Sequence, residues 1–387
     1  MDVAKLRSFW AYKQGLTTPI QGTPEDVITR VGWFRSVGGS SPYLGLYARS
    51  GLLREDVDAA LAQGSIGELP SARGCTYVLP KAHYDMGLRL ALPHAERQIA
   101  SAAKSLALEE SELARLEGAV VASLKESTKD PQDLKMSVGS FINNLGELGK
   151  KKGLSSTLPL ALGRLQAQGL IQRIPKNGRL DQQRYSYRAI ERDKPIDSIP
   201  FDSAVREVAK LFWQWIGPAR LRDFEWFSGL NKGQVEQIAK DVNLAALEDG
   251  WFTSPDEVPL FEKFEPQGQG VHFLGCLDNL FLLRRDLKTH LAETDTDQRV
   301  PTEKGEVAVG SLMDLESHAI VRGGQLIGVW DFDPNLSRLY SRVFEGSSEP
   351  VQAAGERVRR MIIENLDDVR SFSLDSPTSR QAKLSQY

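Results

Sequence analysis

Side chains that most often perform catalysis are sparse in this 387-residue sequence, and their spacing excludes several kinds of site. The two cysteines, Cys75 and Cys276, lie far apart with no CxxC or Cys/His cluster around either, which argues against a zinc site, an iron–sulfur cluster or a disulfide framework. The five histidines show no HExxH or comparable ligand spacing. We therefore expect no metal and no cofactor, and we expect both cysteines to be ordinary buried thiols.

Clustered Lys and Arg residues offer a different chemistry, the binding of phosphate groups. The whole chain has a net charge of −3, but residues 149–194 contain eleven basic and three acidic residues, which gives this segment +8 and the remainder −11. Nucleic acids bind to such clusters because each contact neutralises a phosphate and releases counterions. A solvated surface, the usual role of an isolated lysine run, is the alternative. The phosphate ligands that we expect are Lys150, Lys151, Lys152, Lys176, Arg179 and Arg184.

The elements around these basic residues follow the order of a winged helix. Apolar residues at helical spacing predict one helix over 137–148 and a second over 155–169, with the lysine run in the turn between them. Residues 170–174 and 182–188 alternate like strands around a Lys176-Asn177-Gly178 turn, which predicts a β-hairpin. This order places the basic side chains on the turn and the hairpin that a winged helix presents to phosphates.

Two further units repeat this pattern less regularly. Thr23-Pro24-Glu25-Asp26 supplies a cap, a first-turn proline and first-turn acids for a helix that runs to Phe34, and a helix over 55–62 precedes a strand over 76–79. Residues 220–242 are typical of helix, turn and helix, with Asn231 as the second cap. Beyond about residue 250 the sequence predicts short strands, including a hairpin with a Gly-Gly turn over 319–330, and an amphipathic helix over 351–366.

These patterns predict an α+β protein of several domains. We expect a first winged helix at 1–130, a basic second one at 131–195, a third at 196–262, a β-barrel with a closing helix at 263–372, and a dispensable flexible tail at 373–387. No apolar run approaches the length of a membrane span, and the N-terminus lacks the pattern of a secretory signal. We therefore expect a cytoplasmic protein without a membrane partner, and we do not expect an oligomer.

Several sequence blocks resemble the winged-helix DNA glycosylase family typified by AlkZ and YcaQ. The blocks are Val31 to Val37 with Ser41 to Arg49, Arg73 to Pro80, Gly217-Pro218-Ala219 with Asp223 to Leu230, Leu277 to Leu280, and the hairpin at Gly328-Val329-Trp330. The resemblance runs through most of the chain. It implies three tandem winged helices in a C-shape, a C-terminal β-barrel, and metal-independent hydrolysis of the N-glycosidic bond of alkylated or cross-linked purines in double-stranded DNA.

The signature of that family is a Gln-x-Gln or Gln-x-Asp tripeptide that holds the attacking water, and this sequence has Arg35-Ser36-Val37 in its place. A guanidinium accepts no hydrogen bond, and it repels both the cationic base and the oxocarbenium-like sugar. Arg35 and Val37 thus occupy the catalytic positions of the family, but a guanidinium disfavours the cationic transition state and a valine side chain cannot hold the attacking water. Arg35 is either a phosphate ligand or an ion-pair partner of a first-domain acid. Further expected DNA contacts are Arg73 and Tyr77, which replaces a frequent histidine of the family.

Other residues allow two interpretations each. Tyr43, Tyr47 and Tyr77 either stack on an exposed base or belong to the core. Asp278 is a displaced catalytic carboxylate or, as is more common, the organiser of a turn. The function stays open between a diverged DNA glycosylase and a non-enzymatic DNA-binding protein such as a damage sensor or regulator. A protein-interaction scaffold is the third alternative, which acidic groups that neutralise the +8 segment would favour.

Overall fold

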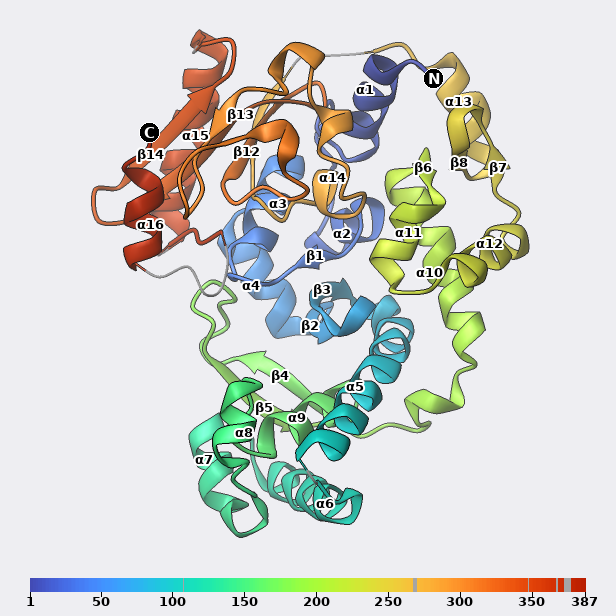
Figure 1. Ribbon diagram of the computed structural model, residues 1–387, viewed down its shortest axis with the longest axis vertical. Coiled ribbons are helices and arrows are strands. Elements are labelled where there is room, and N and C mark those ends of the chain that lie inside the picture. The colour runs from blue at the N-terminus through green and yellow to red at the C-terminus, as the bar shows by residue number, and fades with distance from the viewer. Residues whose placement is uncertain (107, 267–269, 347, 367, 372–376) are drawn as a thin grey trace. The chain divides into compact units, whose positions relative to one another are not determined.

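The computed structural model describes the chain except for residues 107, 267–269, 347, 367 and 372–376 (Figure 1). The chain divides into two compact units, each described by itself below. Unit 1 comprises residues 1–66, 180–182 and 208–387, and unit 2 comprises residues 67–179 and 183–207. None of the described helices is long and apolar enough to cross a membrane.

Unit 2 contains the basic segment packed among long helices. Its elements are β2 (Ile66–Pro70), β3 (Thr76–Pro80), α5 (Tyr84–Leu106), α6 (Glu110–Glu126), α7 (Pro131–Ser137), α8 (Gly146–Lys151), α9 (Leu158–Ala167), β4 (Ile171–Pro175) and β5 (Tyr185–Ala189). Apolar side chains of α5, α6 and α9 form one core, which includes Leu116, Ala161 and Leu165. The predicted order of helix, helix and hairpin is present in α8, α9, β4 and β5.

The single helix predicted over 137–148 is wrong. α7 ends at Ser137, and α8 begins only at Gly146. The N–H of Gly146 donates to Asn144 Oδ1 at 2.8 Å, so a short polar side chain takes the place of a helical carbonyl. Phe141 and Leu148, which a continuous helix would have buried, are exposed.

The predicted hairpin is confirmed, with a longer connection than the Asn-Gly signal suggested. Gly178 turns the chain with a φ of 79°, but strand pairing ends at Pro175 opposite Tyr185. The second strand therefore begins at Tyr185 instead of residue 182. Residues 180–182 belong to the contacts of unit 1.

The N-terminal part of unit 1 consists of four helices and one short strand. They are α1 (Val3–Lys13), α2 (Pro24–Val31), β1 (Phe34–Arg35), α3 (Ser41–Ser50) and α4 (Arg54–Gln63). The predicted cap of α2 is confirmed, because Thr23 Oγ1 accepts the N–H of Asp26 and the carboxylate of Asp26 accepts the N–H of Thr23. α2 ends before the predicted Phe34, since Gly32 adopts a φ of 100° and the chain continues extended into β1.

A second helical group of unit 1 contains the predicted helix, turn and helix. Its elements are α10 (Phe201–Ile216, which starts in unit 2), β6 (Ala219–Arg220), α11 (Leu221–Ser228), α12 (Lys232–Asp241), β7 (Ala245–Ala246), β8 (Trp251–Thr253) and α13 (Val258–Lys263). Asn231 caps α12 as predicted, because its Oδ1 accepts the N–H of Gln234 at 3.0 Å. The three short strands pair in the order β6-β8-β7.

The C-terminal part of unit 1 is an open antiparallel sheet with the strand order β14-β13-β12-β9. Its elements are β9 (Val271–Leu274), α14 (Asn279–Leu282), β10 (Arg299–Val300), β11 (Val307–Ala308), β12 (His318–Arg322), β13 (Gln325–Asp333), β14 (Arg338–Val343) and α15 (Glu349–Asn365). The predicted Gly-Gly hairpin is confirmed in β12 and β13. The predicted β-barrel is not closed in the described residues. β10 pairs with β11, whereas α15 packs against β9 and β14 and covers the sheet (Figure 1).

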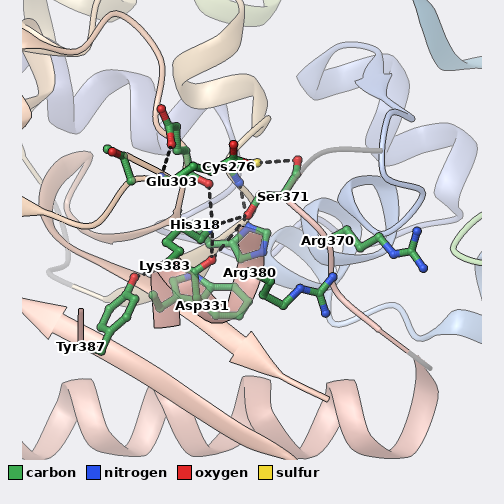
Figure 2. Close-up of polar contacts among 12 residues, drawn as sticks. Cys276, Glu303, His318, Asp331, Arg370, Ser371, Arg380, Lys383 and Tyr387 are labelled. Carbon is green, nitrogen blue, oxygen red and sulfur yellow. Dashed lines mark hydrogen bonds and ion pairs between the residues drawn. The ribbon is translucent and has the colours of Figure 1, made fainter. Parts of the chain in front are cut away.

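The flexible tail predicted for 373–387 is wrong for the residues that the structure describes. Residues 373–376 lie outside them, but Pro377–Leu384 form α16. Lys383 is buried, with Nζ 2.7 Å from Asp331 Oδ1, and the hydroxyl of Tyr387 donates to Asp331 Oδ2 at 2.8 Å (Figure 2). The polar composition of this segment predicted a loose tail. In the structure, Lys383 and Tyr387 instead bind the buried carboxylate of Asp331.

Candidate functional site

The signature residues span the end of β1 and the tightly packed loop that follows it in unit 1. Arg35 and Val37 are half-buried, and Ser36 between them is buried. The carbonyl of Ser36 accepts the N–H of Gly39 at 2.8 Å, and Gly38 and Gly39 have φ values of 83° and 80°. Two successive residues in the left-handed region favour glycine, so the backbone after the signature is fixed by a glycine turn.

Residues 180–182 pack against this glycine turn. A Cβ atom on Gly39 would lie 2.3 Å from Leu180 O and 2.6 Å from Asp181 Cα, so no larger residue fits. The hydroxyl of Tyr43 accepts the N–H of Leu180 at 3.0 Å and donates to Asp58 Oδ1 at 2.6 Å. Tyr43 is 2% exposed, so its ring is core and offers no face to a base. It fixes the tip of the β4–β5 connection beside the signature loop.

Two carboxylates, Asp58 and Asp181, therefore belong to the surroundings of this loop. Burial raises the pKa of Asp58, hydrogen bonds from Tyr43 and Arg54 oppose that shift, and the negative charge of Asp181 adds to it. Sequence reasoning missed both groups. No local signal marks them, because one lies on α4 and the other on the hairpin connection, and only the fold brings Asp181 to Gly39 and Asp58 to the hydroxyl of Tyr43.

Asp278 has a structural role, which confirms the turn-organising interpretation. Arg49 donates to both of its oxygens at 2.7 and 2.8 Å, and both side chains are buried. Asp278 Oδ1 also accepts the N–H of Leu280 and caps α14. The neighbouring Asn279 donates to the carbonyls of Val31 and Gly32, so this block holds the chain that leads into β1.

Arg73 and Tyr77 lie in unit 2 and differ in exposure. Arg73 is half-buried and has a φ of 57°, which is unusual for a residue with a side chain. The next residue, Gly74, packs against an imidazole, since a Cβ there would lie 2.1 Å from His94 Cδ2. Tyr77 is 2% exposed on β3, and a ring so buried presents no face for stacking.

Acidic residues of unit 2 neutralise part of the basic segment. Among the expected phosphate ligands, Lys150 pairs with Glu147 at 2.7 Å and Lys176 with Asp130 at 2.8 Å. The other pairs join Arg164 to Glu96, Glu110 and Glu117, Arg173 to Glu68, and Arg192 to Asp85. Lys151, Lys152 and Arg184 are exposed, and Arg179 is half-buried.

Unit 2 nevertheless keeps a positive balance of charge. It contains 21 Lys and Arg against 16 Asp and Glu, a net +5, which leaves −8 for unit 1. The helix before the hairpin, α9, is largely buried against α5 and α6, and its Arg164 is held by ion pairs. The arrangement suits contacts with phosphates more than the reading of base edges, because no long polar side chain of α9 is fully exposed.

The comparisons with known proteins agree with these blocks of sequence. A family model described as DNA glycosylase AlkZ-like matches residues 21–361, so the chain belongs to the AlkZ-like DNA glycosylase family. Among solved structures the fold is similar to that of the Streptomyces sahachiroi DNA glycosylase AlkZ, with a TM-score of 0.71 and 16% identity over 95% of this chain and 97% of that chain. At that identity the likeness shows the fold alone. No curated protein sequence matches the chain significantly.

Proposed function

We propose that this chain binds double-stranded DNA and that it excises alkylated purines slowly or not at all. DNA binding is supported by its family and by the positive balance of unit 2. Two groups of elements support winged helices as the binding modules, namely α8, α9, β4 and β5, and α11, α12, β7 and β8. Phosphate contacts from Lys151, Lys152 and Arg184 supply affinity without base specificity.

The observation that carries the proposal is Arg35-Ser36-Val37 at the family's signature position. Bond cleavage places positive charge on the sugar, and a guanidinium beside it raises the energy of that state. Val37 has no group that orients water, and Ser36 between the two is buried. The loop therefore lacks both functions that the signature provides in the family. We propose a role in recognising DNA, as a sensor or regulator.

A second candidate is hydrolysis of the N-glycosidic bond by the chain as it stands. It is favoured by two carboxylates. Asp181 lies against Gly39 of the glycine turn, and Asp58 is joined to the neighbouring Leu180 through the hydroxyl of Tyr43. A carboxylate stabilises an oxocarbenium-like sugar and orients water, which are the tasks that Arg35 and Val37 do not perform. Of the two, Asp181 is the better candidate because its backbone packs directly against Gly39, next to the signature.

The test is release of 7-methylguanine from methylated duplex DNA in single turnover. We expect background release by the unmodified chain and a clear rise for the double variant Arg35→Gln/Val37→Gln, because two neutral donor–acceptor groups replace a cation and an alkyl group. Arg30→Gln, on the exposed face of α2, is the matched control and should change nothing.

One result would contradict the main proposal, and a second would contradict its explanation by the signature alone. Robust excision by the unmodified chain, lost in Asp181→Asn, would establish the second candidate. Inertness of the double Gln variant with DNA binding intact would show that more of the site than its signature departs from the family's chemistry.

A further inference from the structure

A groove in unit 2 lies between α5 and the turn that joins α8 to α9. Its cavity volume is about 530 Å³. One wall is a polar face of α5, formed by His94, Arg97, Gln98 and Ser101. The segment from α8 to α9 adds Lys152 and the apolar residues Leu154, Pro159 and Leu160 to the lining. The spacing of the α5 residues, three and four positions apart, puts them on one side of the helix.

The two cations of this groove are not neutralised by a carboxylate among the residues that the structure describes. Arg97 and Lys152 are exposed, and neither forms an ion pair within the described residues of the chain. By contrast, Lys150, Arg164 and Lys176 all have carboxylate partners. Two of the exposed cations of unit 2 therefore line the groove together.

His94, which also lines the groove, is affected by the nearby positive charges. Burial lowers the pKa of His94, and the charges of Arg97 and Arg73 lower it further. His94 is within 3.0 Å of the Gln98 amide, and its ring lies against Gly74, which leaves no room for a Cβ there. The ring is thus fixed, and the loop with the left-handed Arg73 is fixed beside it.

We propose that this groove binds a phosphate group of a nucleic-acid backbone. Arg97 on α5 and Lys152 after α8 supply two positive charges, and the Gln98 and Ser101 side chains add neutral donors. The apolar lining from Leu154, Pro159 and Leu160 suits the sugar face of the same nucleotide. The assignment rests on the proposed function and adds to it a position where DNA is held, and Arg97 is a ligand that sequence reasoning missed.

The test uses the full chain and a fluorescein-labelled 20-base-pair duplex, with anisotropy measured at several salt concentrations. The double variant Arg97→Gln/Lys152→Gln should weaken binding about 10-fold at low salt and reduce the slope of log K against log salt by about one to two. Arg115→Gln/Lys125→Gln is the matched control, since it removes one Arg and one Lys from exposed positions of α6 in the same unit. Unchanged melting temperatures would establish that all forms are folded.

The results separate this proposal from the proposed function. An unmodified chain that does not bind the duplex would overturn both. Duplex binding with the same slope in the groove variant, or an equal loss in the α6 control, would overturn the groove alone. A titration with inorganic phosphate at matched ionic strength adds a further arm. Saturable phosphate binding that is lost in the groove variant while duplex binding is unaffected would assign the groove to a free anion instead.

Discussion

At the scale of single residues, Lys13 at the C-terminal end of α1 shows how a charged side chain becomes part of the core. Its side chain is 7% exposed, and Nζ donates to the carbonyl of Trp213 at 3.0 Å and to Glu257 Oε1 at 2.5 Å. Burial lowers the pKa of Lys13 to about 8, although Glu257 opposes that shift. The ion pair joins α1 to the segment before α13, within unit 1.

This lowered pKa predicts a dependence of stability on pH. Between pH 8 and about 10.5 the unfolded chain holds a proton on Lys13 that the folded chain has lost, so the contribution of this residue to the free energy of unfolding rises with pH across that window. From pH 7.5 to 9.5 the gain is on the order of 2 kcal/mol. The double variant Lys13→Met/Glu257→Gln should lose it, whereas Lys240→Met, on the exposed side of α12, should keep it. Urea unfolding at the two pH values measures the effect, and an equal change with pH in all three proteins would contradict the lowered pKa of Lys13.

At the scale of elements, α16 is the clearest case of a segment whose role the composition concealed. Lys383 bonds to Asp331, to the hydroxyl of Ser371 and to the carbonyl of Glu316, while Arg380 forms a two-pronged pair with Asp368. Figure 2 shows Lys383 and Tyr387 both directed at Asp331. Asp331 lies on β13, so these contacts attach α16 to the sheet.

We therefore expect Lys383→Met to destabilise the chain by roughly 3 kcal/mol, because it leaves the carboxylate of Asp331 buried and unpaired. The double variant Lys383→Met/Asp331→Asn should recover much of the loss, and Ser385→Ala, at an exposed position, should have little effect. Thermal unfolding of the four proteins checks the order. If removal of residues 377–387 leaves the melting temperature unchanged, the tail is dispensable after all.

At the scale of the whole molecule, the two units have opposite net charges, +5 and −8. The net charge of −3 for the whole chain therefore conceals a cationic unit. For this reason the net charge did not exclude a nucleic-acid partner. The third alternative, a protein-interaction scaffold, receives partial support, since Glu147, Asp130 and Glu68 do neutralise members of the basic segment. The cations that stay unpaired favour DNA.

A chelator should affect neither the folding of this molecule nor its binding to DNA. The described residues contain no group of three His, Cys, Asp or Glu side chains that could hold a metal ion. We expect the melting temperature and the dissociation constant for a duplex to be the same with and without 5 mM EDTA, within about 1 °C and a factor of about two. A fall in the melting temperature that zinc or magnesium reverses would show that a ligand set exists.

The sequence by itself determined the features that depend on neighbouring residues. Thr23 and Asn231 cap their helices as predicted, since a cap needs only the next three residues. The Gly-Gly hairpin of β12 and β13 also depends only on residues that are close in the sequence. The family was also readable, because its blocks are short and contiguous, and the family model bears out the resemblance.

The tertiary structure alone decided which charges are available and which groups surround the signature. Arg164 is one of the eleven basic residues of the segment 149–194, yet Glu117, 47 positions away, is within 2.7 Å of it. Asp181 reaches the glycine turn at Gly39 only because the hairpin connection packs in unit 1. An ion pair or a contact between distant positions depends on the path of the backbone, and helical or strand periodicity in the sequence carries no information about that path.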